Sequence, residues 1–260
     1  MSMETTAIGT TPPGTSGEQQ ASRWVERMFA GIAPRYDLAN HLLSFNIDKS
    51  WRRVLVGRLA PVLHNPDARV LDLCCGTGDV LIDLQAAARA CVMGADFCRP
   101  MLASAQRKLL AKGFCVPLLE ADALELPLAC NTLDAVTIAF GFRNLSNYRN
   151  GLSELYRVLK PGGVLAILEF SHPRGALMRA AYGCYSRLLL PAVGWLVAGS
   201  WQAYSYLPGS IRKFPSAERF RTMMLETGFV EARFELLTGG IAALHIASKI
   251  PGSRCSPKPG

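Results

Sequence analysis

Three short β-type runs each end in an acidic residue, a side chain that accepts hydrogen bonds and offsets positive charge. The runs end in DLCCGTGD (residues 72–79), GAD (94–96) and EADA (120–123). The carboxyl ends of parallel strands meet at one edge of a sheet, and open α/β proteins bind their ligands at that edge. We therefore expect the acidic residues of these three segments to surround a single site.

The glycine-rich turn after the first run is typical of a nucleotide-binding loop. Gly76 and Gly78 permit a tight turn and let a ligand approach the backbone closely. A dinucleotide site would favour G-x-G-x-x-G, but Leu81 stands where the third glycine would be. The acids Asp72 and Asp79 also suit a cation better than a pyrophosphate. A nicotinamide-dependent dehydrogenase is therefore disfavoured.

The acidic residues at the ends of these three segments could together hold an adenosine group that carries a positively charged arm. Asp72 can accept hydrogen bonds from an ammonium group, with bracing of the turn as the structural alternative. Asp96 is placed to accept both ribose hydroxyls, as acidic residues also do in NAD sites. Asp122 can accept from the adenine amino group while the Ala123 backbone contacts the ring edge. Capping of a turn is an equally open role for Asp122.

The order of elements predicts the scaffold that brings these residues together. From Arg69 onward, β-type runs alternate with helix-length segments, which is typical of a doubly wound α/β fold with a mostly parallel sheet. The last two β-type runs, EARFELL and ALHIASK, have no helix between them. We therefore expect a terminal hairpin and an antiparallel edge strand. A hydrophobic content of 50% is sufficient for one sizeable core.

We divide the chain into one domain and two tails. Residues 1–20 are rich in Thr, Gly, Pro and Ser and lack periodicity, so we expect a disordered tail there. Residues 250–260 are expected to form a flexible tail. The domain spans residues 21–249, with N-terminal helices at 21–64 and an apolar, basic insertion at 172–215.

The insertion combines positive charge with apolar residues, and three interpretations of it remain open. It contains no acidic residue but many aromatic and aliphatic ones, a composition typical of an element at an anionic membrane surface. It equally suits a lid over a lipid tail, or an ordinary helical insertion packed on the core. No apolar run reaches the roughly 18 residues of a membrane span. Its basic residues are Arg174, Arg179, Arg187, Arg212 and Lys213.

The cysteines and the N-terminal composition favour a bacterial cytoplasmic protein. The eight cysteines contain no C-x-x-C pair, so we expect reduced thiols packed as small apolar side chains, and no metal site. Residues 1–20 lack the Arg and Lys of a mitochondrial transit peptide. The formal net charge of +8 is compatible with solubility alone or with attraction to an anionic partner, either a membrane surface or a nucleic acid.

The segment DLCCGTGD resembles the first motif of class I S-adenosylmethionine methyltransferases. That motif is an acid followed by G-x-G-x-G. Asp72, Gly76 and Gly78 match it, whereas Cys74 stands where the first glycine is expected. The departure makes the segment look like a narrower group, the ubiquinone/menaquinone biosynthesis C-methyltransferase family. The resemblance covers about residues 22–249, with further similar segments at residues 36–51, 139–144, 157–171 and 238–242.

The resemblance implies the seven-stranded class I methyltransferase fold and S-adenosylmethionine as the cofactor. The family's cofactor contacts fall here on Thr77, Asp96, and Asp122 with Ala123, which join Asp72, Gly76 and Gly78 in the set of expected cofactor-binding residues. The implied reaction is C-methylation of a lipid-tailed quinol. We favour demethylmenaquinol as the acceptor, and the precursors of ubiquinone and phylloquinone remain open because they share the reactive ring pattern.

Arg143 and Asn144, at the end of the fourth β-type run, are the candidate catalytic residues. Arg143 can stabilise a developing phenolate electrostatically, with a salt bridge to a neighbouring carboxylate as the alternative. Asn144 can hold a hydroxyl group or a water. His172 and His245 are candidate bases, and structural roles are equally open for both. Tyr36 and Asp37 can close over the cofactor, and a purely structural role is equally open for them.

Two other classes of function stay open. The positive charge is compatible with an RNA methyltransferase, but AFGFRN at residues 139–144 replaces the N/D-P-P-Y segment common in nitrogen-directed nucleic-acid enzymes. We therefore expect no nucleic-acid partner. A non-catalytic S-adenosylmethionine-binding protein would keep the same fold and cofactor residues. No feature of the sequence indicates an oligomeric state.

Overall fold

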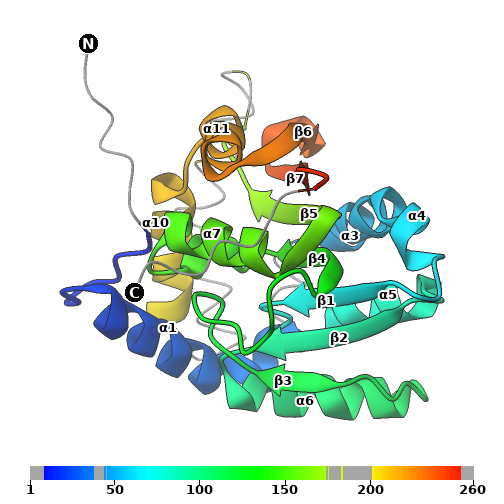
Figure 1. The fold of residues 1–260 in the computed structure, drawn as a ribbon. Coiled ribbons are helices and arrows are strands. Elements are labelled where there is room, and N and C mark those ends of the chain that lie inside the picture. Colours follow the sequence, from blue (N-terminus) through cyan, green and yellow to red (C-terminus); the bar gives the residue numbers. More distant parts are fainter. Residues whose placement is uncertain are drawn as a thin grey trace.

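A seven-stranded sheet lies at the centre of the computed structural model, which describes residues 9–37, 44, 46–173, 175, 183 and 201–252 (Figure 1). The strand order is β3-β2-β1-β4-β5-β7-β6. The predicted doubly wound α/β fold with a mostly parallel sheet is confirmed. The strands are β1 (Arg69–Leu73), β2 (Cys91–Asp96), β3 (Leu118–Glu120), β4 (Leu133–Ala139), β5 (Leu159–Phe170), β6 (Phe229–Leu237) and β7 (Ala242–Lys249).

Among the strands that the structure describes, only β7 runs opposite to the others. The pairs β1–β2, β2–β3, β1–β4 and β4–β5 are parallel, whereas β7 pairs antiparallel with both β5 and β6. The predicted hairpin is therefore present, and the reversed strand, β7, lies second from the edge. The order switches between β1 and β4, and ligands of open α/β sheets bind at such a switch.

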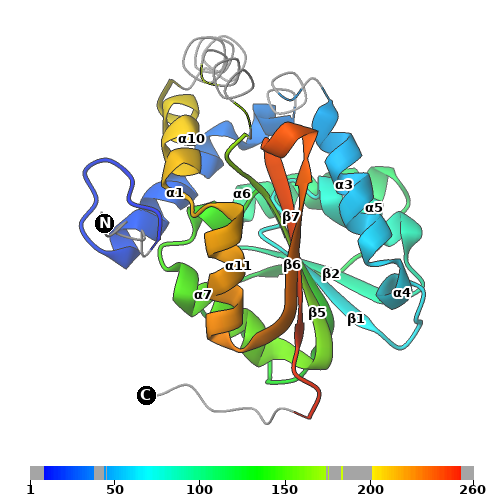
Figure 2. The ribbon, with the colours of Figure 1, turned by 90° about the horizontal axis from the view of Figure 1, so that it is seen from above.

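Helices cover both faces of the sheet, and a further group lies beyond the carboxyl ends of the strands. Figure 2 shows α7 and α11 on one face and α3, α4 and α5 on the other. Figure 1 shows α1 and α10 at the carboxyl ends of β1 and β2. The helices are α1 (Glu18–Ile32), η1 (Ala33–Arg35), α3 (Ile47–Arg58), α4 (Ala60–Leu63), α5 (Asp79–Ala87), α6 (Arg99–Ala111), η2 (Phe142–Asn144), α7 (Tyr148–Val158), α10 (Trp201–Lys213), α11 (Ala217–Thr227) and η4 (Thr238–Gly240).

Local sequence explains where several of these elements begin and end. Only Arg69 of β1 is exposed, as expected for a strand covered on both faces. α7 begins after Asn147 and α11 after Ser216, and each of these side chains accepts a hydrogen bond from the first turn of its helix. α11 ends at Gly228, whose φ of 111° is accessible to glycine without steric cost.

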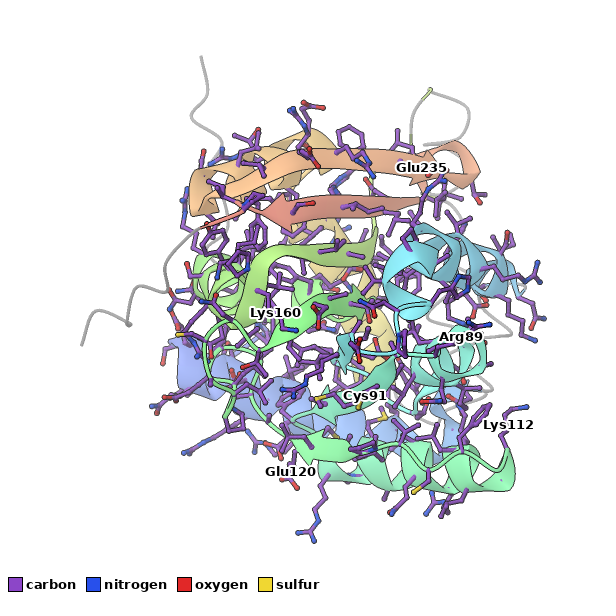
Figure 3. All side chains as sticks on the ribbon, turned by 45° about the vertical axis from the view of Figure 1, so that its right-hand side comes forward. Arg89, Cys91, Lys112, Glu120, Lys160 and Glu235 are labelled. Carbon is purple, nitrogen blue, oxygen red and sulfur yellow. The ribbon has the colours of Figure 1, made fainter. Side chains whose placement is uncertain are left out.

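Apolar side chains fill the space between the sheet and the helices on each face. One cluster includes Leu152 of α7 and Phe220 of α11, and the other includes Leu55 of α3 and Leu81 of α5. These four side chains are completely buried. Charged side chains such as Glu120 lie at the surface instead (Figure 3). The two clusters fix the sheet between its helical layers and thereby fix the ends of its strands.

The predicted disordered tail at residues 1–20 is wrong for the part that the structure describes. α1 begins at Glu18, and Thr10 is only 4% exposed. The backbone N–H of Thr10 donates to the carbonyl of Leu145 at 2.8 Å. Composition predicts disorder where periodicity is missing, but an irregular segment can still be fixed by contacts with residues distant in the sequence.

The structure describes only part of the insertion at 172–215. Helix α10 occupies Trp201–Lys213, and Arg212 and Lys213 at its end are exposed. The other basic residues of the insertion, Arg174, Arg179 and Arg187, lie outside the described residues. No helix in the described ranges is both long enough and apolar enough to cross a bilayer. Of the predicted tail at 250–260, residues 250–252 are described.

The described cysteines are free thiols at five positions and disulfide-bonded at one. Cys130 is disulfide-bonded, so the expectation of reduced thiols is wrong there. Sequence spacing misses such bonds because a disulfide joins residues that the fold brings together. Among the residues that the structure describes, no three His, Cys, Asp or Glu side chains are grouped to hold a metal ion. The free thiols are Cys74, Cys75, Cys91, Cys98 and Cys115.

Candidate active site

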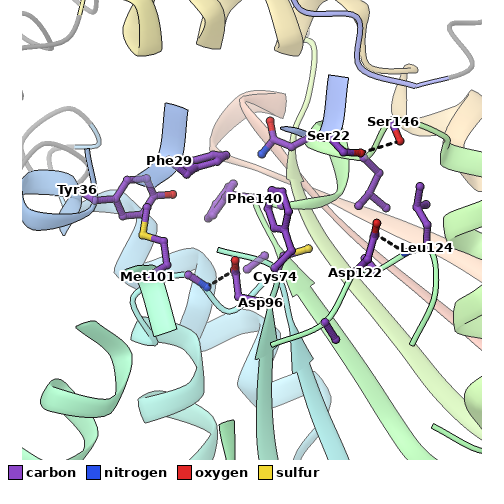
Figure 4. Close-up of a pocket in the computed structure, with 18 residues that line it drawn as sticks. Ser22, Phe29, Tyr36, Cys74, Asp96, Met101, Asp122, Leu124, Phe140 and Ser146 are labelled. Atoms are coloured by element: carbon purple, nitrogen blue, oxygen red, sulfur yellow. Dashed lines mark hydrogen bonds between the residues drawn. The ribbon is translucent and has the colours of Figure 1, made fainter. Parts of the chain in front are cut away.

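A pocket lies at the carboxyl ends of the parallel strands, next to helix α1 (Figure 4). Its volume is about 690 Å³, including the part open to solvent. This is within the roughly 300–1,000 Å³ of small-molecule sites. The predicted site residues that line it are Gly76, Asp96, Asp122, Ala123 and Asn144.

Asp96 is the most constrained acidic group of the pocket. It is 6% exposed, and its carboxylate accepts hydrogen bonds from the backbone N–H of Gly76 at 2.8 Å and of Cys98 at 2.9 Å. Burial raises the pKa of Asp96 to about 6, although these two N–H groups act in the opposite direction. Each oxygen retains a lone pair that can accept from a hydroxyl group of a ligand.

Asp122 and Ala123 line the pocket from the end of β3. The Asp122 carboxylate accepts from the backbone N–H of Leu124 at 2.9 Å, so the turn-capping role is present. Asp122 is exposed, so its carboxylate remains available to a ligand. Ala123 is 5% exposed, with its small side chain in the pocket wall. Capping and ligand binding are therefore compatible at Asp122.

Asp72 lies beneath the glycine turn rather than in the pocket wall. It is 1% exposed, and its Oδ1 accepts from the Thr137 hydroxyl at 2.7 Å. Its Oδ2 is buried without a hydrogen-bond partner among the described residues. Burial raises the pKa of Asp72 to about 7, and the negative charge of Asp96 adds to that shift. An unsatisfied buried carboxylate oxygen beside the turn is a feature that a cationic ligand group would compensate.

Cys74, at the first glycine position of the motif, adopts a glycine-like backbone conformation. Its φ is 55°, in the left-handed region, and its side chain lines the pocket. The neighbouring Gly141 makes this possible, because a Cβ atom there would lie 2.4 Å from the Cys74 Cβ. The departure from the glycine motif is thus accommodated by a glycine elsewhere in the fold.

Thr77 and Gly78 shape the turn but do not line the described pocket. Thr77 is 3% exposed and its hydroxyl donates to Asp37. Gly78 allows α6 to approach, because a Cβ there would lie 3.0 Å from the Cβ of Ala105. The Thr77 hydroxyl is thus engaged within the protein, and cofactor contact at Thr77 stays a prediction.

The charged groups around the turn pair with one another. The Lys108 ammonium binds Asp37 at 2.8 Å and also binds Asp79, and Arg52 lies 3.4 Å from Asp79. The suggestion that Asp79 suits a ligand cation is corrected by these contacts, because the protein's own cations occupy it. These ion pairs connect α3, α5 and α6 to one another around the turn.

Of the two candidate catalytic residues, Asn144 lines the pocket and Arg143 lies behind it. Arg143 is 5% exposed and pairs with the completely buried Glu169 at 2.9 Å. Its guanidinium also donates to the carbonyl of Phe140 and lies 5.3 Å from the ring centre of Phe170. The salt-bridge alternative for Arg143 is therefore the arrangement observed.

Neither candidate histidine lines the described pocket. His245, on β7, is 1% exposed, bonds to the Ala217 carbonyl through Nε2 at 3.2 Å and packs edge-on against Phe220. Burial lowers its pKa to about 4, so it is neutral at physiological pH. His172 is exposed after β5. These contacts favour a structural role for His245.

Apart from Tyr36, the residues of the apolar wall were not predicted from the sequence. Phe29 and Tyr36 come from the N-terminal region and pack edge-to-face with a centroid distance of 5.9 Å. Met101 and Phe140 come from α6 and the end of β4, and Ser22 comes from α1 (Figure 4). Amphipathicity predicted the helices, but no local pattern indicated that Phe29, Met101 and Phe140 would face the pocket.

We predict that Asp72 makes stability depend on pH. Its folded-state pKa of about 7 exceeds the ordinary 3.8, so the folded state binds the proton more tightly and the free energy of unfolding falls as pH rises from about 4 to about 7. Asp72→Asn should remove roughly 3 kcal/mol of that fall between pH 4.5 and 7.5. Urea unfolding at both pH values measures it. The exposed Asp67→Asn is the control, and identical pH dependence in all three proteins would contradict the prediction.

Comparison with known proteins places the chain in a family. The model of the ubiE/COQ5 methyltransferase family matches residues 15–249. The chain is 49% identical to a demethylmenaquinone methyltransferase of Thermus thermophilus, over 85% of this chain and all of that protein. It is 46% identical to the ubiquinone/menaquinone biosynthesis C-methyltransferase UbiE of Syntrophotalea carbinolica, over 86% of this chain and 94% of the relative.

Solved structures agree with the fold. The [4+2]-cyclase SpnF superposes with a TM-score of 0.69 over 95% of this chain and 100% of its own, at 17% identity. A SAM dependent methyltransferase from Aquifex aeolicus gives a TM-score of 0.53 at 22% identity, over 77% of this chain and 98% of its own. At these identities the likeness shows the fold alone. The family match and the high identity to full-length relatives go further: the chain belongs to the ubiE/COQ5 methyltransferase family.

Proposed function

We propose that this protein transfers a methyl group from S-adenosylmethionine to a ring carbon of a prenylated quinol, with demethylmenaquinol as the favoured acceptor. The family match supports the reaction class, and relatives named demethylmenaquinone methyltransferase support the acceptor. The observation that carries the proposal is one pocket at the strand ends that is lined by Asp96, Asp122 and Asn144 together. It offers acidic groups for a nucleoside and an amide for an acceptor.

The acidic groups fit the cofactor's chemistry. Asp96 would accept the ribose hydroxyls, and Asp122 with Ala123 would hold the adenine edge. The unpartnered Oδ2 of Asp72 would face the ammonium group through the turn, and Gly76 leaves room for the cofactor to approach the backbone. Thr77 contributes by fixing the turn, since its hydroxyl is engaged with Asp37.

The apolar wall suits a flat aromatic acceptor. Phe29, Tyr36 and Phe140 supply ring surfaces, and Asn144 supplies hydrogen-bonding groups beside them. When bound, S-adenosylmethionine would supply an electrophilic methyl group: the ring carbon would bond to it as the methyl–sulfur bond breaks, S-adenosylhomocysteine would leave, and the ring carbon would lose its hydrogen as a proton. The residues of the wall hold the ring carbon in line and exclude water, and such positioning contributes roughly 7–11 kcal/mol. Asn144 holds the ring hydroxyl whose deprotonation makes that carbon electron-rich.

Arg143 lies behind the pocket, and we assign it the role of positioning Asn144. The Arg143–Glu169 pair is buried on both sides, and the backbone N–H of Arg143 also donates to Glu169 at 3.2 Å. These bonds fix η2 and therefore the direction in which Asn144 extends. Removal of either partner would leave a buried charge unpaired, which strongly destabilises proteins.

We also propose that the segment 172–215 contacts the anionic inner face of the bacterial cytoplasmic membrane. The support is its composition, with five basic residues and no acidic one, and the exposed Arg212 and Lys213 at the end of α10. A polyprenyl acceptor resides in the bilayer, so an interfacial segment would bring the pocket to its substrate.

The acceptor is tested by methyl transfer from labelled S-adenosylmethionine to demethylmenaquinol and to the benzoquinol precursor of ubiquinone, side by side. We expect label in demethylmenaquinol with kcat/KM about tenfold higher or more, because shape differences in an apolar pocket discriminate by roughly 1–3 kcal/mol. Label that enters transfer RNA and neither quinol would contradict the proposal.

Cofactor binding is tested with Asp96→Asn. This change removes a charge-assisted acceptor for the ribose, so the Kd for S-adenosylhomocysteine should rise by roughly 10- to 100-fold, the equivalent of one strong hydrogen bond. Isothermal titration calorimetry measures the Kd, and a thermal melt checks folding. Glu120→Gln, at the exposed end of β3, is the matched control and should bind as the unmodified protein does. An unchanged Kd for Asp96→Asn would refute the assigned role.

Membrane contact is tested by cosedimentation with vesicles that contain anionic lipid. The triple change of Arg174, Arg179 and Arg187 to Ala should weaken binding by about 1 kcal/mol per residue. The control removes the same charge elsewhere, by changing the surface residues Arg58, Arg149 and Arg219 to Ala. Equal binding by the two triple variants would count against the membrane proposal.

A further inference from the structure

A chain of hydrogen bonds reaches Asn144 from two segments that lie far away in the sequence. The hydroxyl of Tyr206, on α10, donates to Asn144 Oδ1 at 3.2 Å. The same hydroxyl lies 2.6 Å from the Oγ1 of Thr10, in the N-terminal segment. Thr10, Tyr206 and Asn144 therefore form one connected network at the edge of the pocket.

The donors and acceptors of this network have a fixed order. A tyrosine hydroxyl has one hydrogen, and here it is directed at Asn144 Oδ1. The Thr10 hydroxyl must then donate to Tyr206. Because the amide oxygen of Asn144 is engaged, its amide nitrogen Nδ2 is left to donate into the pocket, which the residue lines. Burial raises the pKa of the Tyr206 hydroxyl, so it remains a donor at neutral pH.

Independent contacts hold both ends of the network in place. The Tyr206 ring packs on Trp24 of α1 with a centroid distance of 5.1 Å. The Thr10 N–H donates to the Leu145 carbonyl at 2.8 Å. Gly9 touches the Ser146 backbone so closely that a Cβ atom there would lie 1.9 Å from the Ser146 carbonyl oxygen. The segment at residues 9–10 is thus fitted to the residues that directly follow Asn144.

We propose that Tyr206 and Thr10 are positioning residues that orient the Asn144 carboxamide so that Nδ2 donates to the acceptor's ring oxygen. This inference rests on the proposed function. The developing charge of a phenolate oxygen is stabilised by a donor that is aimed in advance, and a single such donor contributes about 10²–10³ to kcat in enzymes that stabilise oxyanions. Without the network the amide could also present its oxygen, which would repel the same charge, so part of this stabilisation would be lost.

A purely structural role makes different predictions. If the network only fastens the N-terminal segment to α10, its loss lowers thermal stability and affects all variants of Asn144 equally. If the network orients the amide, its loss matters only while the amide is present. A double-mutant cycle separates the two because it measures whether the losses multiply.

The experiment compares Tyr206→Phe, Asn144→Ala and the double variant in the quinol methylation assay. Tyr206→Phe keeps the ring against Trp24 and removes the hydroxyl. We expect kcat to fall by about 10-fold when Asn144 is present and by less than about 2-fold when it is Ala, with little change in the KM for S-adenosylmethionine. Thr10→Val should lower kcat by a similar factor. Thr10→Ser keeps a hydroxyl, so its kcat should remain close to that of the unmodified protein.

The control for loosening the N-terminal segment is Thr11→Val. The Thr11 hydroxyl accepts from Lys213 at 2.7 Å, outside the network, and its removal leaves the Lys213 charge in place, so kcat should remain within about 2-fold. Losses that multiply in the double variant, or an equal effect of Thr11→Val, would overturn this inference while the enzyme stays active. An unmodified enzyme that methylates no quinol would instead overturn the proposed function, and the inference with it.

Discussion

The parallel pairing of β1 with β2 on one side and β4 on the other is the constraint on which the whole site depends. In this register Asp72 lies opposite Gly94 and Thr137, and Asp96 lies opposite Glu120. The strands therefore end at one level, and the turns after them open toward the same space. Since the two apolar clusters clamp the sheet on both faces, this level is fixed before any ligand binds.

Ion pairs within the protein determine which charged side chains remain available to a ligand. Lys108 and Arg52 satisfy Asp37 and Asp79, and Arg143 satisfies Glu169, so these charges are used within the protein. Burial of a pair costs desolvation and is retained where it fixes geometry, which we take to be its role here. The groups left over line the pocket or lie under it, and they are the ones assigned to the cofactor and the acceptor.

The pocket is closed by elements that are not part of the sheet. α1 and α10 contact each other beyond the strand ends, and Figure 4 shows Ser22 of α1 bonded to Ser146 at the pocket edge. Phe29 and Tyr36 add aromatic surface to the pocket wall that we assign to the acceptor. The N-terminal region is thus part of the site, and the acceptor recognition that we propose requires it to be held to residues 144–146.

The sequence by itself determined the α/β scaffold and the pocket residues Gly76, Asp96, Asp122 and Ala123. Their positions follow from local information, because alternating elements make a parallel sheet and parallel strands end at one edge. Only the tertiary structure decided that Asp72 and Thr77 lie outside the pocket wall and that Arg143 pairs with Glu169. It also decided that Thr10 and Tyr206, 196 residues apart, meet at Asn144. The partner of a side chain depends on the packing of distant segments, and no spacing along the chain encodes it.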